Sequence, residues 1–105
     1  MEDSIEYQIY IGFNDSQVLE EIVSGNELLE RVSRYFESNK VSFSMLNAHG
    51  GYLYSKGGFI TENVLCITII GGAEEEMVRI AKGLSMFMNQ ESALIVRTPL
   101  EKQYF

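Results

Sequence analysis

Cysteine, histidine and basic residues are the clearest shortages of this sequence. A single cysteine, Cys66, excludes an internal disulfide and a cysteine-rich zinc site. The single histidine, His49, has no paired carboxylates at ligand spacing, so we expect no bound metal. No segment approaches the roughly 20 apolar residues of a membrane-spanning helix. These shortages argue against disulfide-rich, metal-centred and membrane-spanning proteins.

Lys and Arg number 8 against 15 Asp and Glu, which gives a formal net charge of −7. Nucleic acids and anionic membrane surfaces are bound by clustered basic side chains, whereas the basic residues here are scattered. We therefore expect neither kind of partner. The acidic N-terminus lacks the apolar run of a signal peptide. Together with the single cysteine, this predicts a cytoplasmic location.

Apolar residues, in contrast, make up 46% of the chain, and charged residues 22%. These proportions are ordinary for a globular protein. The length of 105 residues predicts a single domain over 1–105, with a short C-terminal tail over 99–105. No repeat, linker or low-complexity segment interrupts it.

Hydrophobic periodicity predicts four strands and two helices, because apolar residues recur every second position in strands and every third or fourth in helices. In chain order we expect a strand over Ser4–Phe13, a helix from Asn26 to about Asn39, a strand from Val41, a strand over Val64–Ile70, a helix from Glu74 to about Asn89, and a strand over Ser92–Thr98 that Pro99 ends. A short helical turn is expected over Gln17–Val23. The glycine-rich stretch Asn47–Asn63 is interpreted as a hairpin-like excursion.

This order is satisfied most simply by a ferredoxin-like α+β fold: βαββαβ, an antiparallel four-stranded sheet with two helices on one face. The strands from Ser4 and Val64 would be central. Tyr10 falls on the face opposite Tyr7, where no helix covers it. Apolar residues on that face suggest that another subunit or a ligand covers it. We therefore expect self-association through this open face, or through the tail packing on a neighbour's sheet edge.

His49 lies in a glycine-rich stretch predicted to be a flexible turn. It could serve as a general base or contact a ligand, or it could be an exposed turn residue without a role. Cys66 lies in the middle of a strand among apolar residues. It has no cationic neighbour in sequence, so we expect an inert, buried thiol.

Polar residues gather where the predicted strands begin and end, which is a common place for sites on open sheets. Glu62 precedes the central strand, Glu91 precedes the last strand, and Arg97 lies near the exit of that strand. The two carboxylates could act as an acid and base pair if they are close in space. Solvated strand ends are the alternative interpretation.

Gly71 and Gly72 join a strand to a helix that begins with Glu74, Glu75 and Glu76. Such junctions can cradle a phosphate, but three carboxylates in the first turn would repel one. The segment matches neither a P-loop nor a dinucleotide fingerprint. We expect a tight turn here, and no cofactor.

Four short segments together resemble a known group of proteins: Tyr7–Gly12, Gly50–Tyr52, Glu62–Leu65 and Gln90–Ser92. They resemble an uncharacterised family of small bacterial domains that looks distantly similar to the PII-like and CutA-like trimeric proteins. The resemblance implies a ferredoxin-like fold. It also places Asn47–Asn63 where PII-like proteins carry a loop that binds nucleotides and partner proteins. This stretch has Lys56 as its one basic residue, which does not favour ATP.

Three classes of function remain. The leading hypothesis is a non-catalytic, homo-oligomeric ligand-binding or regulatory module, with a small-molecule ligand near His49, Tyr52, Glu62, Glu91 and Arg97. The alternative is a small cofactor-independent enzyme of the isomerase or oxygenase type, with His49 or the Glu62 and Glu91 pair as base. The third is a structural component of a larger complex. The fold class cannot decide among them, because this fold hosts many functions.

Overall fold

The computed structural model describes residues 2–12, 25–53, 56–88 and 93–105. Its elements, in chain order, are β1 (Glu2–Gly12), α1 (Gly25–Asn39), β2 (Ser44–Leu53), β3 (Phe59–Ile70), α2 (Glu74–Phe87) and β4 (Leu94–Lys102). This is the expected βαββαβ order. The helical turn expected over 17–23 falls outside the described residues.

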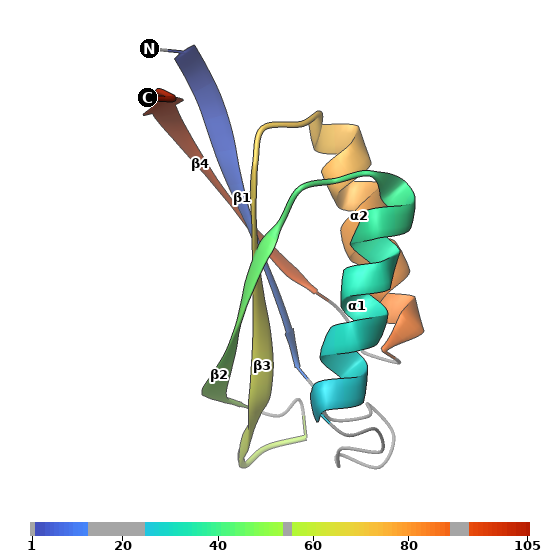
Figure 1. The fold of residues 1–105 in the computed structure, drawn as a ribbon. Helices are drawn as coiled ribbons and strands as arrows, with labels where there is room; N and C mark the ends of the chain where they lie inside the picture. The colour runs from blue at the N-terminus through green and yellow to red at the C-terminus, as the bar shows by residue number, and fades with distance from the viewer. Residues whose placement is uncertain (1, 13–24, 54–55, 89–92) are drawn as a thin grey trace.

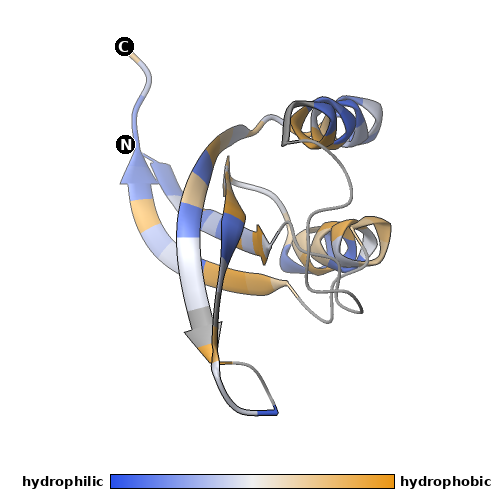
Figure 2. Ribbon diagram, turned by 90° about the horizontal axis from the view of Figure 1, so that it is seen from below, coloured by the Kyte–Doolittle hydropathy of each residue, from blue (hydrophilic) through white to orange (hydrophobic). Residues whose placement is uncertain are grey.

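The four strands form one antiparallel sheet in the order β2-β3-β1-β4. β1 and β3 are therefore central, as expected. Both helices lie on one side of the sheet (Figures 1 and 2), which is the arrangement expected from right-handed crossovers between parallel strands. The start of β1 and the end of β4 lie side by side, since Glu2 pairs with Lys102. The ferredoxin-like α+β fold is thus confirmed.

The core lies between the helices and the sheet. Alternate residues of the two central strands are fully buried there, as period-two apolar patterning predicts. The buried strand residues are Tyr7, Ile9, Ile11, Leu65, Ile67 and Ile69, and the helices contribute Leu28, Val32, Phe36, Met77, Ile80, Ala81 and Leu84. The ring of Phe36 stacks on that of Phe43 with centroids 4.8 Å apart. This stack ties α1 to the segment just before β2.

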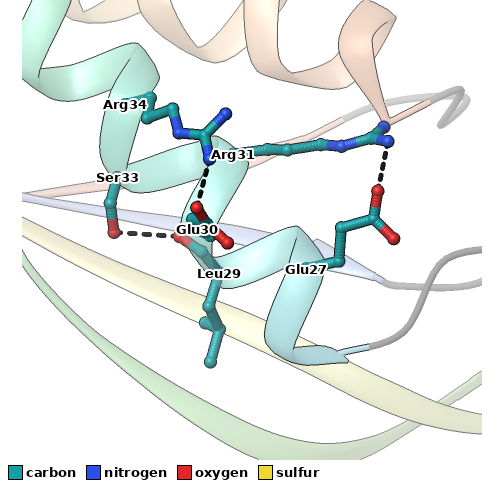
Figure 3. A network of polar contacts seen from close by, with 6 residues as sticks. All are labelled: Glu27, Leu29, Glu30, Arg31, Ser33 and Arg34. Carbon is teal, nitrogen blue, oxygen red and sulfur yellow. Dashed lines mark hydrogen bonds and ion pairs between the residues drawn. The ribbon is translucent and has the colours of Figure 1, made fainter.

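The outer side of α1 carries the two ion pairs that its sequence spacing predicts. Arg31 pairs with Glu27, and Arg34 pairs with Glu30, in each case one turn apart (Figure 3). The side chain of Ser33 donates a hydrogen bond of 2.9 Å to the backbone carbonyl of Leu29. The ion pairs are exposed, so each contributes a few tenths of a kcal/mol at most.

The hairpin-like interpretation of Asn47–Asn63 is confirmed, because β2 and β3 pair from Asn47 opposite Leu65 to Leu53 opposite Phe59. Several expected strand boundaries are wrong, however: β2 begins at Ser44 rather than Val41, and β3 begins at Phe59 rather than Val64. β4 does not end at Pro99, because it continues to Lys102 with Pro99 opposite Ile5. β4 is an edge strand, where a residue without an N–H is tolerated.

The glycines between β3 and α2 form the expected tight turn. Gly71 and Gly72 have positive φ angles of 88° and 103°, which only glycine adopts without strain. The backbone N–H of Gly71 donates a 2.8 Å hydrogen bond to the carbonyl of Ile5. Glu74, Glu75 and Glu76 then occupy the first turn of α2, where negative charge suits the helix dipole.

Candidate functional site

Both helices lie on one side of the sheet (Figure 2), and the surface that faces away from them, called the open face below, carries exposed apolar side chains among the described residues. The most exposed of them are Leu46, Ile70, Leu94 and Val96, at 74%, 52%, 60% and 37%. They come from three different strands, so the exposure belongs to the sheet as a whole. Large apolar side chains exposed on one face of a sheet are typical of a contact surface.

One row of the open face crosses all four strands. Cys66 of β3 pairs with Leu46 of β2 on one side and with Tyr10 of β1 on the other, and Tyr10 pairs with Leu94 of β4. Residues directly opposite each other in an antiparallel sheet share a face. The Tyr10 hydroxyl donates a 2.6 Å hydrogen bond to Oε1 of Gln8, within this face. Tyr10 therefore faces away from the buried Tyr7, as expected.

Cys66 is half-buried, whereas the sequence predicted a buried thiol. It lies on the open face, since its neighbours Leu65 and Ile67 occupy the core side. Partial burial disfavours the thiolate and raises the pKa of Cys66 above its ordinary value of 9.0. The thiol is therefore a poor nucleophile at neutral pH, which is the inert behaviour expected for it.

Glu62 is a buried charged residue on this otherwise exposed surface. Its exposed fraction is 8%, while its neighbour Thr61 is exposed. In the rest of β3 the buried residues are the odd-numbered ones that face the helices. Glu62 breaks this alternation, so its carboxylate is buried on the face without helices.

Glycines flank Glu62 on both neighbouring strands. Gly50 of β2 is its direct partner, and Gly12 of β1 pairs with Val64, two residues further along β3. A Cβ atom built on Gly12 would overlap the Glu62 carboxylate. The carboxyl group thus lies across the backbone of β1 rather than pointing out into solvent. A carboxylate held in partly desolvated surroundings attracts a cation more strongly than an exposed one does.

His49 is not in a flexible turn. It lies within β2, opposite Asn63, and its side chain is exposed. Successive residues of a strand point to opposite faces, so His49 lies on the helix side and Glu62 on the open face. The structure therefore does not bring these two predicted site residues together on one surface.

Arg97 lies in β4 and forms an ion pair with Glu74, the first residue of α2. It is level with Ile69, because both pair with Tyr7. Glu62 lies near the other end of β3, about 23 Å away at about 3.3 Å per residue. Within one chain, Arg97 is therefore separate from Glu62.

Two other predicted site residues are only partly placed. Tyr52 lies in β2 opposite Ile60, two residues after Gly50. Glu91 falls outside the described residues, so its distance from Glu62 stays a prediction. In the described part of the chain, no group of three His, Cys, Asp or Glu side chains could hold a metal ion.

Sequence reasoning selected Glu62 but missed the glycines beside it. Gly12 was interpreted only as part of a strand, although a glycine inside a strand often marks a close approach of another group. Its position continues the alternation of Gln8 and Tyr10 on the open face. A glycine at this position in a strand was visible in the sequence. That Glu62 is the group approaching it could be known only from the register of β1 against β3.

No family model matches the chain, and no curated protein does. Similar solved structures do exist. A phage SAM lyase in complex with S-methyl-5′-thioadenosine matches with a TM-score of 0.70 and 19% identity, over 90% of this chain and 80% of that one. A phage SAM lyase in the apo state matches with a TM-score of 0.64 and 16% identity, over 100% and 98%.

The periplasmic divalent cation tolerance protein CutA from Archaeoglobus fulgidus is also similar, with a TM-score of 0.60 and 10% identity. The match covers 98% of this chain and 88% of that one. Identities this low show a shared fold alone. The CutA-like fold implied by the sequence resemblance is therefore supported, and membership of a family stays a prediction.

Proposed function

We propose that this chain is a homo-oligomeric module that binds a small cationic molecule at Glu62, on an open face that other copies of the chain cover. The observation that carries the proposal is the burial of Glu62. It is the one buried charged residue among those that the structure describes, and it lies on the face that no helix covers. Its carboxylate already takes part in an interaction within the folded chain, and its negative charge on this face would also attract a cationic group that approaches it.

Self-association accounts for the apolar open face. Four apolar side chains on it are at least 37% exposed in the single chain. Covering them with a second copy removes this area from water, at about 25 cal/mol per Å². The sequence resemblance to trimeric CutA-like proteins favours the same arrangement. The C-terminal tail, with Tyr104 and Phe105 exposed, is a further contact for a neighbouring copy.

S-adenosylmethionine is the first ligand to test. Two of the similar structures are phage SAM lyases, one of them in complex with S-methyl-5′-thioadenosine. S-adenosylmethionine carries a sulfonium cation, which a carboxylate attracts, and S-methyl-5′-thioadenosine is the neutral thioether of the same nucleoside. S-methyl-5′-thioadenosine also lacks the amino-acid chain, so the pair separates recognition of the nucleoside from recognition of the sulfonium and amino-acid part, and Glu62→Gln then isolates the contribution of the Glu62 charge.

The test is isothermal titration calorimetry of the wild type and Glu62→Gln with both compounds. We expect the wild type to bind S-adenosylmethionine more tightly than the thioether, and Glu62→Gln to lose about tenfold of that preference, or about 1.4 kcal/mol. Glutamine keeps the shape of the side chain and removes its charge. Equal affinities of the two proteins for S-adenosylmethionine would refute a role for the Glu62 charge.

Three of the other predicted site residues are tested in the same way. The proposal extends the site to Glu91, so Glu91→Gln is expected to weaken binding of S-adenosylmethionine. His49 and Arg97 can join the site only from another copy, because each is separated from Glu62 within one chain. A loss of affinity for S-adenosylmethionine in His49→Ala or Arg97→Gln would therefore show that the site is shared between copies.

Cleavage of S-adenosylmethionine is a second candidate function. Its support is the fold shared with two SAM lyases together with the buried carboxylate of Glu62. In this alternative Glu62, and not His49, is the candidate acid or base, because it is the buried group. Chromatographic detection of S-methyl-5′-thioadenosine after incubation, in the wild type but not in Glu62→Gln, would establish catalysis. Binding without this product would leave a non-catalytic module.

A cytoplasmic location remains part of the proposal. No helix in the described ranges is long and apolar enough to cross a membrane. Fractionation of cells that produce the tagged protein tests the location, and recovery in a periplasmic fraction would overturn it.

A further inference from the structure

Gly12 is the last residue of β1, and its conformation does not explain why it is glycine. The glycines with positive φ among the described residues are Gly57, Gly58, Gly71 and Gly72, and Gly12 is not one of them. Any residue can adopt its extended backbone. The reason for glycine must therefore be space.

The space at Gly12 is filled by one side chain. The three atoms nearest to an ideal Cβ there are the carboxyl carbon and both oxygens of Glu62, all inside the distance that real contacts allow. On the opposite side of Glu62, a Cβ on Gly50 would approach Cγ2 of Val64 to 2.8 Å. Glu62 therefore extends from β3 across β1, and the missing side chain of Gly12 makes room for it.

We infer that Gly12 is a positioning residue for Glu62: its lack of a side chain allows the carboxylate to lie against the sheet instead of pointing away from it. The consequence for ligand binding rests on the proposed function. A carboxylate held flat on the sheet presents its charge at a fixed place, which favours a ligand whose cation reaches that place. An alanine at position 12 would displace the carboxylate toward solvent.

The test is a double-mutant cycle between position 12 and position 62, read by thermal denaturation and by titration with S-adenosylmethionine. Unlike an exposed ring, the buried Glu62 carboxylate takes part in an interaction that is disturbed when it moves, so Gly12→Ala is expected to lower the melting temperature by about 5 °C and to weaken binding at least tenfold. Glu62→Asp shortens the side chain by one methylene. In the double variant, the shorter side chain fits beside the new alanine methyl group, so the stability lost in Gly12→Ala should be largely regained.

Gly51→Ala is the matched control. It changes a glycine in the same sheet, but its Cβ would meet the ring of Phe59, which is 69% exposed and can turn aside. We expect it to leave binding unchanged. Additive effects of Gly12→Ala and Glu62→Asp on stability would overturn the inference.

The two readouts separate the inference from the proposed function. If the wild type fails to bind S-adenosylmethionine while positions 12 and 62 remain coupled in stability, the ligand proposal fails and the positioning role stands. If binding depends on Glu62 while Gly12→Ala is neutral, the positioning role fails. Should Gly12→Ala alone fail to fold, recovery of folding in the double variant would support the role, and continued failure would contradict it.

Discussion

At the scale of single residues, the open face holds two groups with unusual surroundings, Glu62 and Cys66. Glu62 was selected as a polar residue at a strand entrance, but β3 begins at Phe59, so Glu62 lies inside the strand. Its burial was not predictable, since it depends on Gly12, which is distant in sequence and reaches Glu62 through the register of β1 and β3. Residue identity is local information, whereas burial is a property of the assembled sheet.

Cys66 gives a pH-dependent prediction. Burial raises its pKa in the folded chain, so the unfolded chain loses its thiol proton first as the pH rises. The contribution of Cys66 to stability is therefore complete below about pH 9 and declines as the pH rises toward its higher folded pKa. Urea denaturation between about pH 8 and about pH 10.5 should show a steeper loss of stability in the wild type than in Cys66→Ala.

The same thiol should react slowly with Ellman's reagent in the folded protein and faster in urea at the same pH. Alanine is the control for stability because it cannot titrate, so the alkaline titration of tyrosines and lysines cancels in the comparison. Parallel pH profiles of the wild type and Cys66→Ala would contradict the assigned effect of burial.

At the scale of elements, periodicity predicted the helices and the buried parts of strands, and it failed where strands leave the core. The β2 and β3 hairpin beyond Asn47 has exposed residues on both faces, so no apolar alternation marks it. Pro99 suggested a strand end, but an edge strand such as β4 tolerates proline. The ends of these strands depend on pairing with a neighbouring strand, and the residues of one segment alone do not show that pairing.

The end of α1 offers a stability prediction. Lys40 follows the helix with a φ of 57°, and the N–H of Val41 donates to the carbonyl of Phe36 at 3.1 Å, as at helix ends closed by a left-handed residue. Lysine is strained in this conformation and glycine is not. Lys40→Gly is expected to raise the free energy of unfolding by about 1 kcal/mol.

Urea denaturation of Lys40→Gly and Lys40→Ala measures this effect. Alanine removes the same lysine side chain but keeps the strain, so Lys40→Ala should not gain the stability that glycine gives. Equal stability of the two variants would show that the backbone conformation at position 40 is not the cause.

At the scale of the whole molecule, the order of elements specified the sheet and its two helices, and hence the existence of an uncovered face. The sequence also placed Tyr10 on that face correctly. The extent of apolar exposure was not predictable from the sequence. Leu46 and Leu94 lie in the same row of the sheet because three strand pairings connect them, and the sequence does not give those pairings. The proposed function therefore depends on what covers this face.

Multi-angle light scattering after size exclusion tests this central claim most directly, using two matched substitutions in β2. Leu46 is 74% exposed on the open face, and Leu53 is 76% exposed on the opposite face, because the two lie an odd number of residues apart in the strand. We predict a wild-type mass that is a multiple of 11.9 kDa, a similar mass for Leu53→Glu, and about 11.9 kDa for Leu46→Glu. A wild-type mass of 11.9 kDa, or a Leu46→Glu variant that assembles as the wild type does, would contradict self-association through the open face.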